Sequence, residues 1–593
     1  MKLSNKFLTA MLAAGFTTCT LAESIFPPPE WSESIDPIAS SYAEKGGTLR
    51  FAASQPPKSF NYYIDNNTYV QLLFSMMYET LLSTDPQTTE FVPKLASRWS
   101  ISDDMLTYTF QIDPEARWSD GVPVTARDVK WTFDQIMDPK NPTGAFKVML
   151  GEFASPEIVD FTTVRFTAST IHWRNLLALG AFEIMPEHAF KGQDFNKLEL
   201  ANAVISGPYT MDLVKEQIST RMRRREDWWA AGRPSNRNTM NFDYIVFKYF
   251  SSQENAFESF KKDGVDVYAV YTARLWANET VGERFSKNWI VKQRVNNYKP
   301  VGFQGFALNS RKFPFDDLRV RKAFAHLVDR ETMNRTMMFD AYFLHRSYYE
   351  DLYDQEHPCP IPLIDFDIEK AKALLKEAGY VMNPQTGILE KAGRELTFDF
   401  LTRDSTSDKF LVLVDNALKQ VGIKMNIVRK DFAAWMRDVD VFNFNVTWAS
   451  WSASRFRDPE QTWHSREAAR NSSNNISGFK DERVDALIER QRTIFDLDER
   501  NQICREIDTI LTQNVPYVLL WNINCVRVLY WNKLGTPPTL LGKFSDERSL
   551  ISYWWYDRES AAELKAAMKN STFLPHQQEE IDFDSFFQPQ TNE

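Results

Sequence analysis

Aromatic and charged side chains gather between residues 440 and 470, where together they could bind a chemically mixed ligand. They are Phe442, Phe444, Trp448, Trp451, Phe456 and Trp463, interleaved with Arg455, Arg457 and Asp458. Residues 442–446 alternate between apolar and polar side chains, which predicts a strand, and segment 449–459 predicts a loop at its end. Ligands of α/β proteins bind in crevices at such strand ends. The loop is therefore a candidate binding site, although core packing is an equal alternative for any single aromatic residue.

No pattern of a known catalytic, nucleotide or metal site occurs in the sequence. Phosphate-binding loops, dinucleotide-binding glycine motifs, HExxH and GxSxG are all missing. The seven histidines are scattered and form no ligand pair at i, i+4. Adjacent acidic residues such as Asp103 and Asp104 do not face each other across a cleft, as the carboxylates of a glycoside hydrolase must. We therefore predict no enzyme, no cofactor and no metal site.

The strongest basic run is RMRRR at residues 221–225. In a strand, Arg221, Arg223 and Arg225 would share one face. Such a row is typical of a solvated edge strand, where charges prevent unwanted strand pairing. The alternative is a patch for an anionic ligand or partner.

Length and charge exclude several classes of protein. The 593 residues are enough for three or four domains. The net charge of −10 argues against general binding of nucleic acids, which requires a basic surface. Apolar residues make up 43% and charged residues 25%, so the chain is not predicted to be disordered or fibrous. No run of 18 apolar residues predicts an ordinary membrane-spanning helix.

Residues 1–22 have the features of a cleaved secretory signal peptide. Lys2 and Lys6 precede the apolar stretch 7–16, and small residues lead to a cleavage site near Ala22. Lipidation of Cys19 is the less favoured alternative. Export would place the mature chain in an oxidising compartment, the periplasm.

Three cysteines remain after such cleavage, so at most one intrachain disulfide can form. Cys504 and Cys525 are the candidate pair. Isolated thiols, including Cys359, are the favoured prediction.

Alternating helix and strand patterns predict an α/β fold. Thr125 to Asp128 and Ser251 to Glu254 are capping boxes that each begin a helix. Asp367 caps another helix, which Gly379 ends. The other predicted features are a strand at 48–52, a helix at 66–82, an apolar strand at 515–521, an extended leader at 23–45 that forms no folded element and a loose acidic tail after 573.

Several stretches resemble the peptide-type (family 5) extracellular solute-binding proteins that serve ABC importers, and the resemblance extends over about residues 44–565. They are GGTLRFA (46–52), RWSDGVPVTARDVKWTFD (117–134), SGPYTM (206–211), NFDYIVFKYFSSQENAFESFKKDGVDVY (241–268) and FALNSRKFPFDDLRVRKAFAHLVDRE (306–331). Residues 226–245 and the YWWYD motif at 553–557 look most like the oligopeptide-binding branch associated with microcin C uptake.

The resemblance implies a two-lobed periplasmic binding protein of type II, similar to cluster C, with an extra subdomain inserted in the first lobe. The implied parts are a signal peptide at 1–22, a leader at 23–43, a discontinuous domain Ia at 44–80, 200–303 and 525–570, domain Ib at 81–199, domain II at 304–524 and a loose tail at 571–593. Hinge strands would cross between the lobes near 305–309 and 517–525.

The implied function is capture of extended oligopeptides or peptide-like compounds between the lobes, for delivery by a monomer to an inner-membrane ABC permease. The regular N–H and C=O groups of an extended peptide can be bound without reading its sequence. Water in the side-chain pockets accommodates different residues, and bound ligand shifts the lobes toward a closed state. The alternatives are a non-peptide solute such as a sugar, nickel or haem complex, an exported hydrolase, and a surface scaffold.

The resemblance also indicates the substrate-binding residues. They are Tyr62, Asn66, Phe303, Gln304, Asn309, Trp448, Trp451, Ser454, Arg455, Arg457, Asp458 and Trp521. In better-known relatives an aspartate in the matching loop holds the peptide α-amine, and here that position falls near Ser454. Asp458 could act from its shifted place, or Arg455 and Arg457 could instead hold a carboxylate or phosphate.

Overall fold

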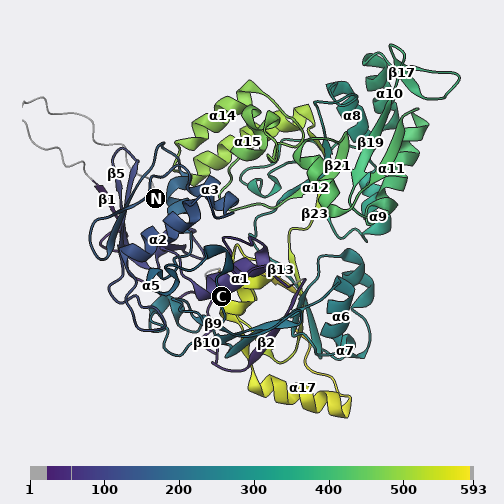
Figure 1. Ribbon diagram of the computed structural model, residues 1–593. Coiled ribbons are helices and arrows are strands. Elements are labelled where there is room, and N and C mark those ends of the chain that lie inside the picture. The colour runs from purple at the N-terminus through teal and green to yellow at the C-terminus, as the bar shows by residue number, and fades with distance from the viewer. Residues whose placement is uncertain (1–22, 55, 588–593) are drawn as a thin grey trace, which may run out of the picture.

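The computed structural model describes residues 23–54 and 56–587, and the predicted signal peptide lies outside them. The chain forms two lobes of mixed helices and strands, which confirms the predicted α/β class and two-lobed architecture (Figure 1). The second lobe is the mostly green part at the top of Figure 1, and the first lobe lies below it and to the left. Among the described residues, no helix has the length and apolar character needed to cross a membrane.

The first sheet of the first lobe has the order β2-β11-β10-β9. Its strands are β2 (Thr48–Ala53), β9 (Tyr209–Lys215), β10 (Ser219–Arg224) and β11 (Tyr244–Tyr249). Helix α1 (Thr68–Met77) is shorter than the helix predicted at 66–82. It begins where Asn67 accepts a hydrogen bond from the backbone N–H of Val70, and it ends at Met77. β10 has a partner on each side, so the basic run is not on an edge strand as predicted. Arg221 instead pairs with Asp212 at 2.9 Å between Nε and Oδ1.

A second sheet, of order β1-β5-β6-β8-β7, carries α2 (Ala126–Met137). Its strands are β1 (Glu23–Phe26), β5 (Ala96–Ser102), β6 (Thr107–Ile112), β7 (Glu157–Ile158) and β8 (Thr163–Thr167). The capping box of Thr125 and Asp128 begins α2, as predicted. The leader is not an unfolded extension, because β1 pairs with β5 and Ile38 is only 2% exposed. Burial of these apolar side chains attaches the leader to the first lobe.

The third sheet contains strands from three distant parts of the chain, in the order β12-β24-β13-β27. They are β12 (Val267–Ala269), β13 (Ile290–Asn296), β24 (Val526–Trp531) and β27 (Glu580–Asp582). β27 runs parallel to β13, and both Ile581 and Phe583 are buried in the first-lobe core. The prediction of a loose tail is therefore wrong up to residue 587.

The second lobe is built on one five-stranded sheet of order β20-β19-β21-β14-β22. Its strands are β14 (Phe303–Leu308), β19 (Thr397–Thr402), β20 (Lys424–Arg429), β21 (Val446–Trp451) and β22 (Tyr517–Leu519). Its main helices are α8 (Leu318–His326), α10 (Ile368–Glu377), α11 (Asp408–Gln420), α12 (Phe432–Asp440), α14 (Glu482–Arg492) and α15 (Leu497–Asn514). Asp367 caps α10, as predicted.

The strand predicted at 442–446 begins four residues later, at Val446. Phe442 follows the end of α12 with a positive φ of 57°, a left-handed conformation that ends the helix and precludes a regular strand there. The predicted loop accordingly starts after Trp451, not at Ala449.

The remaining elements are short or peripheral. In the first lobe they are β3 (Leu82–Thr84), β4 (Phe91–Pro93), α3 (Gly144–Leu150), α4 (Arg174–Gly180), α5 (Glu187–Phe190), α6 (Gln253–Lys261), α7 (Glu283–Ser286), β25 (Leu534–Gly535), α16 (Leu550–Tyr553), β26 (Trp555–Tyr556) and α17 (Arg558–Asn570). In the second lobe they are α9 (Arg330–Met337), β15 (Phe343–Leu344), β16 (Val381–Met382), β17 (Leu389–Lys391), β18 (Arg394–Glu395), α13 (Glu460–Trp463) and β23 (Trp521–Asn522).

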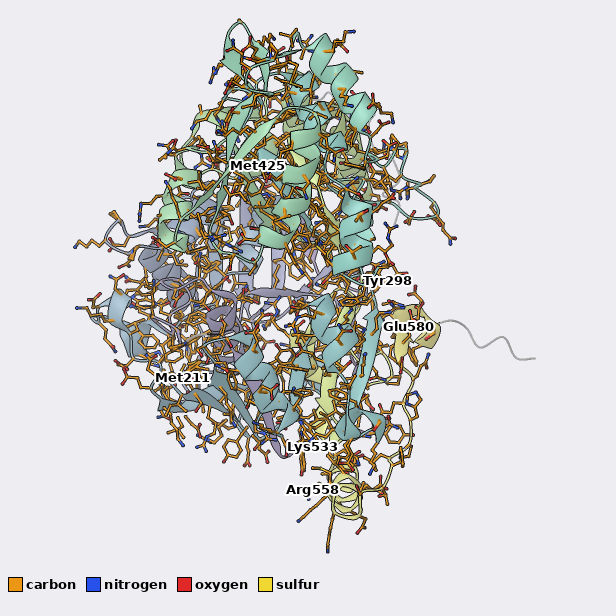
Figure 2. The ribbon with its side chains drawn as sticks, turned by 90° about the vertical axis from the view of Figure 1, so that its right-hand side faces the viewer. Met211, Tyr298, Met425, Lys533, Arg558 and Glu580 are labelled. Atoms are coloured by element: carbon orange, nitrogen blue, oxygen red, sulfur yellow. The ribbon has the colours of Figure 1, made fainter. Side chains whose placement is uncertain are left out.

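The chain crosses between the lobes at two places. Residues 297–302 join β13 to β14, and residues 523–525 join β23 to β24. Since β14 lies wholly in the second-lobe sheet, the first crossing precedes the hinge strand predicted at 305–309. Figure 2 shows Tyr298 at the level where the two lobes meet. Cys359, Cys504 and Cys525 are free thiols, so no disulfide constrains the described residues near this hinge.

Candidate functional site

A cavity of about 350 Å³ lies in the second lobe where β21 ends and β14 begins. We call it the aromatic pocket. Its aromatic lining residues are Phe303, Tyr348, Tyr349, Trp451, Phe456 and Trp463. Its polar side chains are Ser452, Ser454, Arg457, Asp458, Gln461, Thr462 and Asn474. Apolar ring faces with a few charged groups are typical of a site for small molecules or peptides.

Packed rings fix the shape of the aromatic pocket. Phe303 stacks on Trp463 with ring centroids 5.8 Å apart and meets the Tyr517 ring edge-on at 5.3 Å. The Trp451 indole nitrogen donates a hydrogen bond to the Tyr517 hydroxyl at 3.1 Å. Burial holds the pKa of Tyr517 above its ordinary value, so this hydroxyl stays protonated. Edge-to-face packing fixes the Tyr517 ring, and its hydroxyl orients Trp451 before any ligand binds.

Arg457 supplies a buried positive charge to the aromatic pocket. Its residue is 7% exposed, and its guanidinium pairs with Asp351. Among the described residues, its Nε has no hydrogen-bond partner. A planar guanidinium with unused donors is suited to a carboxylate. The arrangement can therefore hold an anionic group of a ligand against the aromatic rings.

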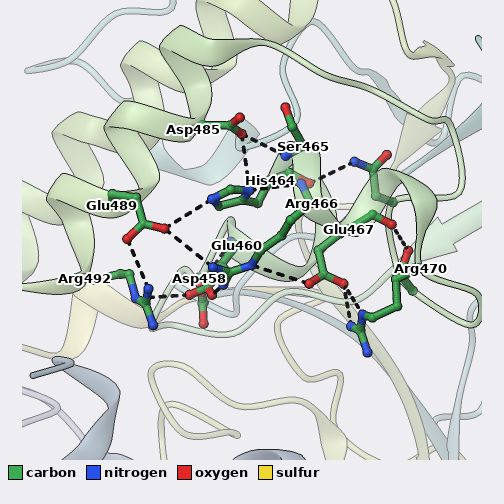
Figure 3. A network of polar contacts seen from close by, with 12 residues as sticks. Asp458, Glu460, His464, Ser465, Arg466, Glu467, Arg470, Asp485, Glu489 and Arg492 are labelled. Atoms are coloured by element: carbon green, nitrogen blue, oxygen red, sulfur yellow. Dashed lines mark hydrogen bonds and ion pairs between the residues drawn. The ribbon is translucent and has the colours of Figure 1, made fainter. Parts of the chain in front are cut away.

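Asp458 lines the same pocket but is paired across the lobe interface. Its Oδ2 accepts a hydrogen bond from Arg174 Nη1 at 2.7 Å, and Arg174 begins α4 of the first lobe. Glu460 lies close by, with its Oε2 3.5 Å from His172 Nε2. We call the contact between residues 172–174 and residues 458–460, together with Arg492, the interlobe latch. Figure 3 shows its second-lobe side, where Asp458, Glu460 and Arg492 join a wider polar network.

The latch inserts a first-lobe segment into the second lobe. Trp173 is 6% exposed, and its backbone N–H donates to the Arg492 carbonyl oxygen at 2.9 Å. The Arg500 guanidinium carbon lies 4.3 Å from the Trp173 ring centroid, a cation–π contact. His172 is 1% exposed. These burials exist only while the lobes are in contact.

The loop 452–459 makes two further contacts with the first lobe. The Arg455 guanidinium carbon lies 4.4 Å from the Phe544 ring centroid. Phe456 stacks on Phe91 with a centroid separation of 6.3 Å and approaches Trp173 at 6.5 Å. One loop therefore forms a wall of the aromatic pocket and a large part of the lobe interface.

His172, Asp458 and Glu460 each offer a potential metal ligand, and these atoms lie within 4.8 Å of one another. The donor set fits an ion-pair cluster better than a metal site. His172 Nδ1 accepts the backbone N–H of Arg174 at 3.2 Å, which places the proton of the neutral ring on Nε2, the atom facing Glu460. Arg174, Arg466 and Arg492 already compensate the two carboxylates. Burial lowers the pKa of His172 to about 4.

Trp448, Gln304 and Trp521 form a second aromatic cluster. Gln304 Oε1 accepts from the Trp448 indole at 3.0 Å, and its Nε2 donates to the Trp521 carbonyl at 2.8 Å. Side chains alternate between the faces of a strand, so Trp448 and Trp451 point to opposite faces of the sheet. Phe303 and Gln304 are consecutive residues of β14, so their side chains also point to opposite faces of the sheet. The predicted residues of these two strands therefore lie on both faces of the sheet, and only Phe303 and Trp451 among these five line the aromatic pocket.

Three further predicted residues, besides Trp448, Gln304, Trp521 and Arg455, do not line the aromatic pocket. Tyr62 packs against Phe74 and Phe146 in the first lobe, and Asn66 is exposed just before α1. Asn309 has no exposed surface, and its amide donates to the carbonyl oxygens of residues 442 and 444. Its role in this conformation is to anchor the end of β14, because no part of it can reach a ligand.

Sequence reasoning missed six residues that line the aromatic pocket: Gly302, Tyr348, Tyr349, Gln461, Thr462 and Asn474. Two consecutive tyrosines in a segment without helix or strand periodicity were the available signal for Tyr348 and Tyr349. Nothing local pointed to Gln461 or Asn474, because only the folding of the loop after β21 brings them to the pocket.

Comparison with known proteins places this architecture among transport proteins. Residues 90–473 match the family described as bacterial extracellular solute-binding proteins, family 5 Middle. An uncharacterized protein, YejA of Escherichia coli (strain K12), is 27% identical over 570 residues, which cover 89% of this chain and 91% of that protein. A probable peptide-binding protein YejA of Agrobacterium fabrum is 27% identical, covering 84% and 88%.

A solved structure shares the fold. The oligopeptide-binding protein AppA of Bacillus subtilis, in complex with a nonapeptide, superposes with a TM-score of 0.67 at 20% identity. The superposition covers 87% of this chain and 100% of AppA. At this identity the likeness concerns the fold, which is that of the two-lobed periplasmic binding proteins.

Proposed function

Because this chain belongs to the family 5 bacterial extracellular solute-binding proteins, we propose that it captures extended oligopeptides or peptide-like compounds and delivers them to an ABC importer. The aromatic pocket is the proposed anchoring point of the ligand, and the interlobe latch holds the lobes closed over it. AppA and the Agrobacterium fabrum YejA, whose names describe peptide binding, support the choice of ligand class.

One observation carries this proposal: the loop 452–459 serves both the pocket and the lobe interface. Phe456 and Asp458 line the aromatic pocket and also contact Phe91 and Arg174 of the first lobe. A ligand that orders this loop also aligns the groups that close the lobes. Binding and closure are then coupled, because the ligand favours the conformation that it contacts.

The pocket chemistry suits peptides of varied sequence. Trp451 and the neighbouring rings offer faces on which different side chains can stack. Arg457 is the proposed partner of a peptide carboxylate, either the C-terminus or an acidic side chain. Asp458 is held by Arg174 in this structure. A free peptide amine would have to compete with that guanidinium, so we propose that a free N-terminus is not required.

Among the other predicted residues, we assign direct ligand contact to Phe303, Trp451 and Ser454, which line the pocket. Arg455, Trp448, Gln304 and Trp521 are assigned supporting roles at the lobe interface and in the sheet. The proposed domain limits remain 44–80, 200–303 and 525–570 for Ia, 81–199 for Ib and 304–524 for II.

The proposed setting is the periplasm, after cleavage of a signal peptide, with a monomer presenting its closed form to an inner-membrane permease. We also propose that the chain belongs to the branch associated with microcin C uptake, on the strength of residues 226–245 and the YWWYD motif at 553–557. We propose no catalytic role, since the members of this family are binding proteins of transporters.

Native mass spectrometry of freshly purified protein tests the function. We expect co-purified peptides, and small-angle scattering should show compaction when a stripped sample is given the same peptides. Isothermal titration with one peptide in free and N-acetylated forms should give similar affinities. Arg457→Met should weaken binding, whereas the matched variant of the exposed Arg437 on α12, Arg437→Met, should not.

Three outcomes would contradict the proposal. Cleavage of a mixed peptide pool by the purified protein would indicate a hydrolase. A co-purified metal complex, haem or sugar with no affinity for any peptide would indicate a different solute. A rigid shape with every peptide tested would argue for a scaffold.

A further inference from the structure

A second cavity, of about 270 Å³, lies in the second lobe away from the proposed peptide site. It is bounded by α8, the segment 345–348, the loop 361–364 and the chain from the end of α15 into β22. We call it the basic cavity. Tyr348 lines both this cavity and the aromatic pocket, so the two spaces are neighbours separated by one aromatic side chain.

The ionisable side chains that line the basic cavity are all basic, apart from tyrosines. Lys322, His326, Arg330, His345 and Arg346 all line it, and no aspartate or glutamate does. The chain as a whole carries a net charge of −10, so chance alone favours acidic neighbours. Clustering of cations at a concave surface concentrates the field there and attracts anions.

Arg330 is a fixed positive charge in the cavity wall. It is 5% exposed and donates from Nη1 to the carbonyl oxygens of His345 and Leu519, both at 2.8 Å. A third bond runs from Nη2 to the Ile364 carbonyl oxygen at 2.7 Å. Backbone carbonyls orient this guanidinium but carry no net charge to neutralise it. The cavity therefore contains a permanent, rigidly placed cation.

Lys322 and His345 have donors that nothing in the described structure uses. The Lys322 side chain makes no hydrogen bond or ion pair with any described residue. His345 is 1% exposed, and its Nε2 has no hydrogen-bond partner among the described residues, whereas its Nδ1 lies 3.5 Å from Glu350 Oε2. Buried polar groups are normally satisfied, so a buried ring nitrogen without a partner in a cavity wall indicates a missing ligand.

Two acidic groups outside the lining pair with some of its basic residues. Glu350 Oε2 lies 3.5 Å from His345 Nδ1, and it accepts the backbone N–H groups of Arg346 and Ser347 at 3.0 and 3.1 Å. Asp365 pairs with Lys370 on α10 and also lies 3.4 Å from Nδ1 of His326. The partial negative charge at the end of α15 meets Arg321, whose Nε donates to the Asn514 carbonyl oxygen at 3.0 Å. None of these carboxylates enters the cavity lining.

Apart from Thr512, Gln513 and Tyr517, the rest of the wall is mostly apolar. Ile361, Ile364, Val515 and Val518 line it, together with the ring of Tyr348. A simple inorganic anion would leave this surface unused, whereas an apolar body gains free energy by covering it. A cavity of this size accommodates only a small molecule.

From these observations we propose that the basic cavity binds a small organic carboxylate, with the carboxylate at Lys322 and His345 and an apolar body against Ile361 and Val518. This site is distinct from the peptide site, because its walls come from α8, α15 and β22 and not from the loop 452–459. Its occupant would touch Tyr348 from the side opposite to a peptide.

Benzoate is the probe for the first test, by isothermal titration calorimetry of the full chain at neutral pH. We expect saturable binding of one benzoate, and no measurable binding of uncharged benzamide. Lys322→Met should weaken benzoate binding by about tenfold or more, since a charge-assisted contact is lost. Lys424→Met, which removes an exposed lysine of β20, should leave it unchanged. Thermal denaturation should confirm that both variants are folded.

Peptide affinity separates this proposal from the proposed function. Lys322→Met should bind peptides as the unaltered protein does, so loss of benzoate binding with intact peptide binding supports the second site. Benzoate that binds equally well to Lys322→Met, or does not bind at all, would overturn it. Inorganic phosphate that binds as tightly as benzoate would overturn the assigned ligand class.

A crystal soaked with 4-bromobenzoate gives the location directly. Anomalous bromine density beside Ile361, with the carboxylate toward Lys322, is the expected result. Density found only in the aromatic pocket would contradict the proposal even if the titration were saturable.

Discussion

The aromatic pocket and the interlobe latch share one loop, but they differ in how they are built. The pocket belongs to the second lobe alone, and its rings are already packed around Phe303 and Trp463. The latch exists only between lobes, because Arg174 and Trp173 come from the first and Asp458 and Arg492 from the second. The first is a preformed apolar surface, and the second is a set of charges assembled by closure.

This difference separates affinity from closure. A preformed pocket loses little conformational entropy when a ligand binds, so it can supply most of the binding free energy. Ion pairs across the lobes gain strength only as water leaves the interface. We therefore expect variants in the pocket to change ligand affinity in any conformation, and variants in the latch to change the balance between open and closed forms.

Trp451→Ala should have the largest effect. It removes one wall of the aromatic pocket and the hydrogen bond to the Tyr517 hydroxyl. We expect peptide affinity to fall by about tenfold to a hundredfold, measured by calorimetry. Phe573→Ala, which removes an aromatic ring that is 70% exposed in the first lobe, is the control and should have no effect. Unchanged affinity of Trp451→Ala would show that the pocket is not the anchoring point.

Arg174→Ala tests the latch. It removes the ion pair with Asp458 and leaves that carboxylate at the pocket without its partner. We expect about a tenfold loss of peptide affinity, accompanied by a larger radius of gyration of the peptide complex in small-angle scattering. Arg127→Ala, at the exposed first-lobe pair with Glu187, is the matched control. Full compaction of Arg174→Ala with peptide would mean that the latch does not hold the lobes.

The pH dependence of closure should have a smaller effect. The buried ring of His172 has its pKa lowered to about 4, against an ordinary value of 6.5. Opening exposes the ring, so between these values the open form binds a proton that the closed form does not. The contribution of His172 to closure is thus fully present above about pH 6.5 and is lost as the pH falls toward 4.

We expect peptide affinity to drop between pH 7.5 and pH 5, by less than the limit of about thirtyfold that pKa values of 4 and 6.5 set, and His172→Gln to flatten that dependence. The groups facing His172 are Arg174, Asp458, Glu460 and Arg492. Asp458 and Glu460 both pair with guanidinium groups. An unchanged pH profile in His172→Gln would assign the effect to another group.

Ser454→Ala should have the smallest effect. Its hydroxyl lines the aromatic pocket and accepts the backbone N–H of Phe456 at 3.2 Å, within its own loop. We expect calorimetry to show affinity within about a factor of two of the unaltered protein. A large loss would place a polar anchor of the ligand at the position where relatives are expected to hold the peptide amine.

Local signals in the sequence were sufficient for much of the fold. The side chains of Thr125 and Asp367 satisfy backbone groups within the next few residues, so the starts of α2 and α10 could be predicted. The loop after β21 was identified from its local composition. Trp451, Arg457 and Asp458 do line one pocket. The resemblance to a known family supplied the two lobes, which local patterns could not.

The errors arose where distant parts of the chain meet. Arg174 and Asp458 are 284 residues apart, so no periodicity could predict that this aspartate is already paired. Trp448 and Trp451 were placed together because the strand was predicted to end at residue 446. In the structure both residues belong to β21, so their side chains point to opposite faces of the sheet. The leader and the tail lacked strong patterns of their own, and each is ordered by a strand that another segment provides.

The docked tail has a practical consequence for anyone handling this protein. β27 pairs with the last residues of β13, directly before the crossing at 297–302, and Tyr298 there hydrogen-bonds to Asp584. Figure 2 shows Glu580 close to that junction. Residues 580–584 thus stiffen the chain directly before the hinge. A truncation before residue 580, or a bulky affinity tag next to these residues, would alter the balance between open and closed lobes. Assays of closure are therefore best made with the tag elsewhere.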